Sequence, residues 1–220
     1  MSVVIRPARE EDAPQAQAVM NEAKTLPMLG GFVMLEQLKT GFTKGNGEKG
    51  IHNIVAEVDG EILGVSQISP HDYHIEMGLV AVHEDHRQKG YGSSMYFGHV
   101  LRAALEGRLF LLDQVAHFNE VMRYKYMPAL DFHMELLQRN KIRNWCSLAY
   151  YRYDLLNKGL QPWIERFNKT GFEIQVEDHD YYKQKFAENR DELLRQGREE
   201  DAKKIGDNMV QAKEFLGLLG

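Results

Sequence analysis

Apolar and polar residues follow two different spacings along this chain. Five segments carry a short apolar run or an alternation of apolar and polar residues, which predicts β-strands because successive strand side chains point to opposite faces. Other segments repeat their apolar residues every three or four positions, which predicts amphipathic helices. The predicted strands are residues 2–6, 51–58, 61–68, 73–82 and 109–115.

Helices are predicted between the first two of these strands. Residues 10–24 place Ala13, Val19 and other apolar side chains on one side, and 32–42 has a shorter pattern of the same kind. The polar, glycine-rich stretch 41–50 predicts a loop. Asp59-Gly60 then separates two strand patterns, which is typical of a tight hairpin turn.

A strand, a glycine-containing loop and a helix follow one another after the hairpin. Apolar β-branched residues up to Val82 suit a buried strand, and beyond Gly92 apolar residues recur at helical spacing as far as Gly107. Gly90 and Gly92 let a ligand approach the backbone closely. Because the first amides of a helix lack partners and lie at the positive end of its dipole, this segment predicts a phosphate site.

The run Arg87-x-x-Gly90-x-Gly92 resembles the acetyl-CoA pyrophosphate loop of the GNAT superfamily of N-acetyltransferases, and the preceding order of strands and helices agrees with it. The resemblance implies that Val80 and Val82 line the pantetheine arm, with a main-chain amide near Val80 holding the thioester carbonyl. It also implies that seven residues surround the pyrophosphate, namely Arg87, Gln88, Lys89, Gly90, Tyr91, Gly92 and Ser93.

The resemblance further implies an α/β (α+β) fold with a mixed, mostly antiparallel central sheet flanked by helices. A splay between two strands would hold acetyl-CoA as co-substrate. We expect an acetyltransferase domain over residues 1–180 and a charged, helical C-terminal extension over 181–220, interrupted by Gly197 and Gly206. The extension packs either on the body or against a second subunit, which would make a homodimer.

Glu76 is the candidate general base. A strand carboxylate that faces the cleft can take a proton from an amine, and strand alternation predicts that Glu76, Gly78 and Val80 share one face. The position resembles that of the base glutamate in the histone acetyltransferase branch of the family. The alternative is a carboxylate that binds the positive charge of the acceptor or only meets solvent.

Two registers compete for the general acid that protonates the leaving thiolate. In the first, Asn119 resembles the pantetheine-contacting asparagine and Tyr126 the family's acid, although Gly-Phe is replaced by Asp-Phe132. In the second, the segment that ends at Phe172 puts Phe167 at the tyrosine position, and phenylalanine has no proton to give. We favour the first, which makes 145–154 and 172–177 the last two of seven strands with a helical insertion between them.

Composition describes an ordinary globular protein of 220 residues, with 43% hydrophobic and 27% charged residues. A net charge of −5 gives no general attraction to nucleic acid, although a local basic patch is compatible with it. The single cysteine, Cys146, fits a reducing compartment and resembles a buried thiol more than a nucleophile. No membrane span or signal-peptide core is recognisable, so we expect a cytoplasmic protein.

Four histidines lie close together in the sequence, at His71, His74, His83 and His86. They do not form the His-Glu-x-x-His helix pattern of a zinc enzyme. We expect histidines that meet solvent or the acceptor, and no metal.

The predicted function is transfer of acetyl from acetyl-CoA to a primary amine, carried by a small molecule or a protein, through direct attack in a ternary complex. Two alternatives stay open. One is a GNAT-fold module that binds CoA without catalysis. The other is a transferase that uses a different acyl donor on a protein or nucleic-acid acceptor.

Overall fold

The structure is a computed structural model of the whole chain that describes residues 2–22, 35–36, 39, 42, 52–116, 119–139, 147–176 and 179–218. All of the predicted loop at 41–50 except Phe42, most of the predicted helix at 32–42, Trp145 and Cys146 lie outside the described residues. Within them, no helix is both long and apolar enough to cross a membrane.

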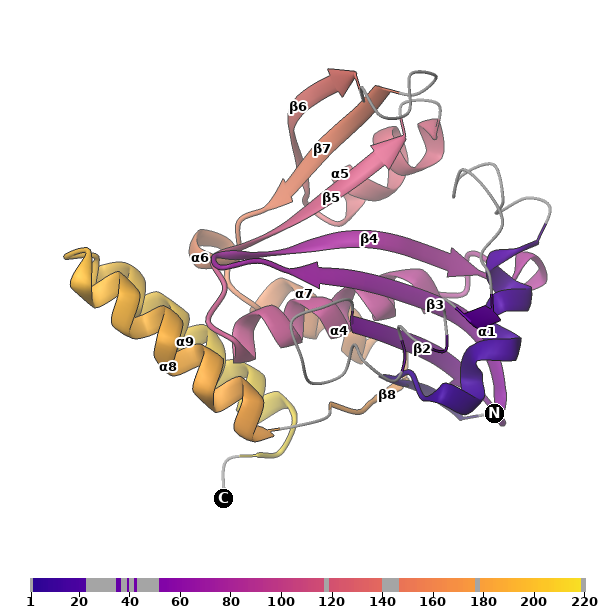
Figure 1. Cartoon of the computed structure of the whole chain (residues 1–220), viewed down its shortest axis with the longest axis horizontal. Helices are drawn as coiled ribbons and strands as arrows, with labels where there is room; N and C mark the ends of the chain where they lie inside the picture. The colour runs from indigo at the N-terminus through magenta and orange to yellow at the C-terminus, as the bar shows by residue number, and fades with distance from the viewer. Residues whose placement is uncertain are drawn as a thin grey trace.

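The described strands form one sheet in the order β6-β7-β5-β4-β3-β2-β1-β8 (Figure 1). Neighbours are antiparallel except for two parallel pairs, β4 with β5 and β1 with β8. This confirms the predicted mixed, mostly antiparallel sheet. The strands are β1 Val3–Pro7, β2 His52–Val58, β3 Glu61–Pro70, β4 His74–Val82, β5 Phe110–Ala116, β6 His133–Arg139, β7 Ser147–Tyr153 and β8 Glu173–Ile174.

The helices lie on both faces of this sheet and at its end (Figure 1). The predicted helix at 10–24 begins as a 3-10 turn and has a shorter α-helical part than expected. The helical elements are η1 Glu10–Asp12, α1 Ala13–Met20, η2 Glu84–His86, α4 Tyr91–Leu105, the π-turn η3 Met122–Tyr126, α5 Met127–Ala129, α6 Leu155–Lys158, α7 Gln161–Asn168, α8 His179–Arg195 and α9 Glu199–Phe215.

The hairpin between β2 and β3 forms where Asp59-Gly60 predicted it. Asp59 has a φ of 49° and Gly60 a φ of 89°. A two-residue turn with both residues in the left-handed region follows the twist of its strands. The turn therefore sets the pairing of the residues next to it, Val58 with Glu61 and Glu57 with Ile62.

Among the described residues, the two larger of three hydrophobic clusters lie on opposite faces of the sheet. Alternate residues of β3 separate them, since Val65 packs under α1 while Ser66 faces His99 of α4. Close packing of α4 depends on Gly98, because a Cβ there would come within 2.9 Å of Ile54 Cδ1. The core under α4 is the larger of the two and also receives α7 and parts of α8 and α9.

The C-terminal segment forms a helical hairpin that packs on the body. Gly197 lies in the connection between α8 and α9 and has a left-handed φ of 71°. Gly206 lies inside α9 and does not interrupt this helix. Tyr182 of α8 and Ala212 of α9 are buried in the core under α4. The hairpin therefore completes the hydrophobic interior.

The prediction of seven strands is wrong, because the described residues form eight. The missing strand is β6, whose segment reads His-Met-Glu-Leu-Leu-Gln-Arg and is rich in residues that favour helices. Its strand conformation comes from pairing with β7, a long-range contact that local propensity does not encode. The strand predicted at 172–177 is reduced to β8, which extends the far edge beside β1.

Candidate functional site

The sheet opens between β4 and β5. The two strands pair only from His74 with Phe110 to Met77 with Asp113. Beyond this point β4 continues beside β3 and β5 continues beside β7, so the two central strands diverge (Figure 1). Main-chain groups on either side of the opening are thus released from the β4–β5 ladder.

The loop after β4 turns sharply before α4 begins. Gln88 has a φ of 65° and Gly90 a φ of 94°, so both lie in the left-handed region. Gly90 is the N-cap of α4, and its carbonyl accepts hydrogen bonds from Ser93 Oγ at 2.9 Å and from Ser94 N at 3.0 Å. A β-branched residue would be strained at position 90, which explains the need for glycine there.

Several backbone N–H groups of this loop have no hydrogen-bond acceptor within the described part of the chain. Among the described residues, no acceptor is assigned to the N–H groups of residues 88–93. The first amides of a helix are unsatisfied by geometry, and the helix dipole adds positive potential at the same place. The side chain of Arg87 is directed to the strand, since its Nε donates to Val82 O at 3.1 Å. The loop therefore offers main-chain donors to an anion.

The residues expected to line the pantetheine arm lie beside this loop. A Cβ at Gly92 would lie 3.8 Å from Val82 and 4.0 Å from Val80, so the two valines flank the first turn of α4. Glycine at position 92 leaves this place open to a ligand. The fold thus brings Val80, Val82, Gly90 and Gly92 to one side of the sheet.

A β-bulge at Gly78 corrects the predicted face of Glu76. Gln67 pairs with Leu79 but Ile68 pairs with Met77, so Gly78 is an extra residue in β4. The bulge inverts the alternation: Met77 and Val80 pack toward α4, and Leu79 packs toward α1. The prediction that Glu76 and Val80 share a face is therefore wrong, and Glu76 lies on the α1 side.

Glu76 lies one residue before the opening and is held across it. Gln114, the first residue of β5 beyond the last pair, donates from Nε2 to Glu76 Oε1. The other carboxylate oxygen is 3.5 Å from Nε2 of His71. The Glu76 side chain is 27% exposed, so solvent or an acceptor can reach it.

On the α4 face of the sheet, a buried hydrogen-bonded pair of side chains lies at the point where β4 and β5 separate. Tyr96 of α4 donates its hydroxyl to Asp113 of β5, the residue at the last β4–β5 pair. Burial raises the pKa of Asp113 to about 6, and the negative charge of Glu76 adds to the rise. The contact fastens the helix that carries the loop to the strand at the base of the opening.

Asp113→Asn is expected to make the protein more stable at pH 8 and to change little at pH 4.5. Because the folded pKa is raised, the carboxyl favours folding when protonated, and this contribution is lost as pH rises from about 4 to about 6. A shift of about two units corresponds to about 3 kcal/mol, or a rise in Tm of about 5–10 °C at pH 8. Thermal melts of both proteins at the two pH values measure this, and an equal difference at each pH would contradict it.

Asn119 and Tyr126 lie in the segment after β5, and both make contacts within the fold there. Asn119 Oδ1 accepts from Met122 N at 3.3 Å and so caps the helical turn. Tyr126 ends the π-turn and packs, half-buried, against the core under α4. Asp131 has a φ of 62°, and Phe132 N donates to Met127 O at 2.9 Å. The Asp-Phe pair therefore makes the left-handed closing turn for which a glycine is usual.

The alternative alignment for the general acid, which puts Phe167 at the tyrosine position, falls on α7. Phe167 is buried, with its ring centroid 4.8 Å from that of Phe97. Thr170 and Phe172 then lie beside the loop, since a Cβ at Gly90 would be 3.7 Å from Phe172 and 3.8 Å from Thr170. This neighbour of the loop was missed from sequence, because nothing local indicates that a segment 80 residues downstream returns to it.

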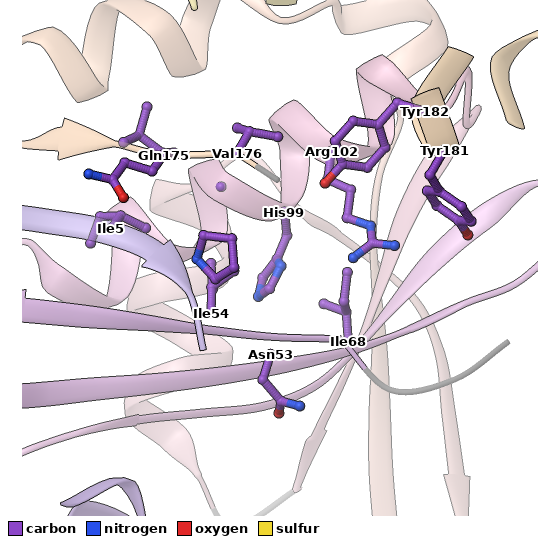
Figure 2. A pocket seen from close by; sticks show the side chains of 13 residues that line it. Ile5, Asn53, Ile54, Ile68, His99, Arg102, Gln175, Val176, Tyr181 and Tyr182 are labelled. Carbon is purple, nitrogen blue, oxygen red and sulfur yellow. The ribbon is translucent and has the colours of Figure 1, made fainter. Parts of the chain in front are cut away.

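A separate cavity lies between α4, β1, β2 and the segment from β8 to α8 (Figure 2). His99 and Arg102 point into it from α4, and Tyr181 and Tyr182 border it. Its volume of about 40 Å³ suits a few water molecules rather than a nucleotide. Ser66 Oγ lies 2.7 Å from Nε2 of His99, so this histidine makes a buried hydrogen bond that joins α4 to β3.

The histidines of the sequence cluster separate into two groups. His83 Nε2 lies 3.4 Å from Glu22, two residues beyond α1, and the His83 and His86 rings are 5.3 Å apart, next to the loop. His71 and His74 lie instead beside Glu76, with donor atoms of all three within 4.8 Å of one another. Burial lowers the pKa of His74 to about 4, with the charge of His71 contributing.

Comparisons with known proteins agree with this geometry. Residues 49–125, which include the loop and the opening, match the family model described as the acetyltransferase (GNAT) domain. Over this segment, about a third of its length, the chain is similar to the GNAT acetyltransferases. No curated protein matches it significantly by sequence.

Solved structures share the fold at low identity. An N-acetyltransferase from Staphylococcus aureus Mu50 superposes with a TM-score of 0.58 at 22% identity, over 70% of this chain and 99% of that one. A ribosomal-protein-alanine N-acetyltransferase from Brucella melitensis gives 0.55 at 22%, over 69% and 99%. The Salmonella typhimurium protein yncA with its cofactor acetyl-CoA gives 0.56 at 18%, over 72% and 97%.

Proposed function

We propose that this protein transfers an acetyl group from acetyl-CoA to a primary amine. The observation that carries the proposal is the set of unpartnered loop amides at the start of α4, next to the opening in the sheet. Main-chain donors at a helix start bind a diphosphate well. The single cysteine fits a reducing compartment, and we place the reaction in the cytoplasm.

The two faces of the sheet divide the substrates between them. Val80, Val82 and the loop lie on the α4 side, where the pantetheine arm would run toward the opening. Glu76 and Gln114 lie at the opening on the α1 side. An amine approaching from the α1 side would meet the thioester within the opening, as direct transfer in a ternary complex requires.

The chemical step needs one base and one acid. The neutral amine nitrogen attacks the thioester carbonyl carbon, and the C–S bond breaks as the tetrahedral intermediate collapses. Glu76 takes the proton from the amine, and Tyr126 gives its hydroxyl proton to the departing thiolate. Amides released from the ladder near Val80 would stabilise the oxyanion, because donors fixed in place need no reorganisation.

Calorimetry with acetyl-CoA, followed by CoA release with a panel of amines, tests the proposal. Binding at micromolar Kd together with release that depends on one class of amine would support it. Binding without turnover on any amine would favour a module that only holds CoA. Stronger turnover with another acyl-CoA, read from the product mass, would favour the alternative donor. Absence of acetyl-CoA binding would refute the proposal.

Tyr126→Phe is expected to lower kcat about 100-fold or more while the Kd for acetyl-CoA stays unchanged. The hydroxyl is needed only when the thiolate departs, and general acid catalysis is typically worth about 10²–10⁴-fold. Tyr124→Phe is the matched control, since Tyr124 is two residues away and 68% exposed. Equal rates in the two variants would remove Tyr126 from catalysis.

A further inference from the structure

The connection between β3 and β4 carries a group of side chains that the proposed chemistry leaves largely unexplained. His71 lies in this connection, and His74 and Glu76 are the first and third residues of β4. One donor atom from each of the three lies within 4.8 Å of the others. Two imidazole nitrogens and a carboxylate oxygen form a donor set that suits Zn²⁺ and related transition-metal ions.

We propose that His71, His74 and Glu76 form a binding site for a single divalent transition-metal ion of the Zn²⁺ class. Three protein ligands would leave the fourth tetrahedral position to water. An ion bound there would occupy the carboxylate assigned above as the base, and so would inhibit acetyl transfer. Only this inhibitory consequence rests on the proposed function, because the site itself is defined by the three side chains.

The backbone that carries the donors is rigidly held. His71 N donates to His74 O at 2.9 Å, which closes the turn. The buried Arg108 guanidinium donates to the carbonyls of His71 and Asp72, and it is itself paired with buried Glu106 at 2.6 Å. Fixed backbone of this kind lowers the conformational entropy lost when an ion is bound.

Binding of an ion would require the side chains to move closer together than they are in the structure. The His71 and His74 rings are stacked 4.6 Å apart at an interplanar angle of 10°, so their lone pairs do not yet converge. Neighbouring donors on tetrahedral zinc lie roughly 3.4 Å apart, given bonds of about 2.0–2.2 Å. His71 is 47% exposed and its Nε2 is already 3.5 Å from Glu76, so this is the ring that has room to turn toward a bound ion.

The surrounding charges permit a cation. The His74 ring stacks on Phe110 with centroids 4.9 Å apart, and Arg152 Cζ lies 4.0 Å from the centroid of the same Phe110 ring. Arg152 is paired with Glu135 at 3.2 Å, and the nearby Arg108 is paired as described. Both guanidinium groups thus have a carboxylate partner, and Glu76 contributes negative charge directly to the ion.

Calorimetric titration of the EDTA-treated full chain with Zn²⁺ tests the site, and visible absorption of bound Co²⁺ reports the coordination geometry. We expect one ion per chain in the wild type. His71→Ala and His74→Ala should each weaken binding about 100-fold or more, since loss of even an outer partner costs about 10- to 100-fold. His133→Ala, at a histidine 66% exposed on β6, is the matched control and should bind as the wild type does.

The outcomes separate cleanly. No saturable binding in the wild type, or equal affinity in His71→Ala and His133→Ala, would overturn the site. His71 is exposed, so its variant keeps the test valid if His74→Ala does not fold. Inhibition is measured as the difference between the wild type and His71→Ala, because released CoA thiol also binds zinc. Bound zinc without inhibition would overturn the regulatory half, and a chain inactive on every amine would leave the calorimetric result unaffected.

Discussion

Glu76→Gln is expected to lower kcat for acetyl transfer by about 10²–10⁴-fold, the usual contribution of a positioned general base. The amide has nearly the same shape as the carboxylate and can still pair with Gln114 after one amide is turned over. Binding of acetyl-CoA should be unchanged, since the loop lies on the other side of the sheet. Steady-state rates and calorimetry on the same preparation measure both effects.

Glu61→Gln is the matched control for this substitution. Glu61 begins β3 and is exposed, and its removal should leave kcat within twofold, about 0.4 kcal/mol. If Glu76→Gln also stays within that range, the carboxylate only meets solvent or attracts the acceptor. A higher KM with unchanged kcat would assign it to acceptor binding.

Gly90→Val is expected to abolish binding of acetyl-CoA while the protein remains folded. Valine at a φ of 94° is strained, and its side chain would enter the space in front of Phe172 and Thr170. Relief of the strain must move the loop, so the amides lose their common direction. We expect an increase in Kd of at least about 100-fold, equivalent to about 2.8 kcal/mol, measured by calorimetry.

Gly60→Val separates this effect from strain in general. Gly60 lies in the hairpin between β2 and β3 with a similar φ of 89°, and a Cβ added there would meet no atom within 4 Å. Both variants should lose about 1–3 kcal/mol of stability, a fall in Tm of about 3–10 °C. Unchanged affinity for acetyl-CoA in Gly90→Val, with the expected fall in Tm, would remove the loop from cofactor binding.

Local sequence signals predicted the elements that form the opening and its loop. Strand patterns, the Asp59-Gly60 turn and the two glycines at the start of α4 each depend on neighbouring residues, and the structure confirms them. The bulge at Gly78 was not predictable in this way, because an extra residue in β4 is defined only by its pairing with β3. That single insertion moved Glu76 to the other face of the sheet.

Features that depend on distant segments were missed for the same reason. The strand β6 exists because β7 pairs with it, and Phe172 reaches the loop because α7 packs on α4. The sequence groups His71 with His74, but without the His-Glu-x-x-His pattern it did not predict a metal there. The three-dimensional contact with Glu76 supplied that reason.

The C-terminal hairpin has a practical consequence for recombinant work on this protein. The superposed solved structures cover about 70% of the chain, so a shortened chain is an obvious choice for expression. Yet the Phe215 ring lies 5.2 Å from Phe97 of α4 and 5.9 Å from Phe167 of α7. A chain shortened to end before α8 would expose the Phe97 and Phe167 rings to solvent and promote aggregation. Both terminal helices should therefore be kept when the protein is expressed.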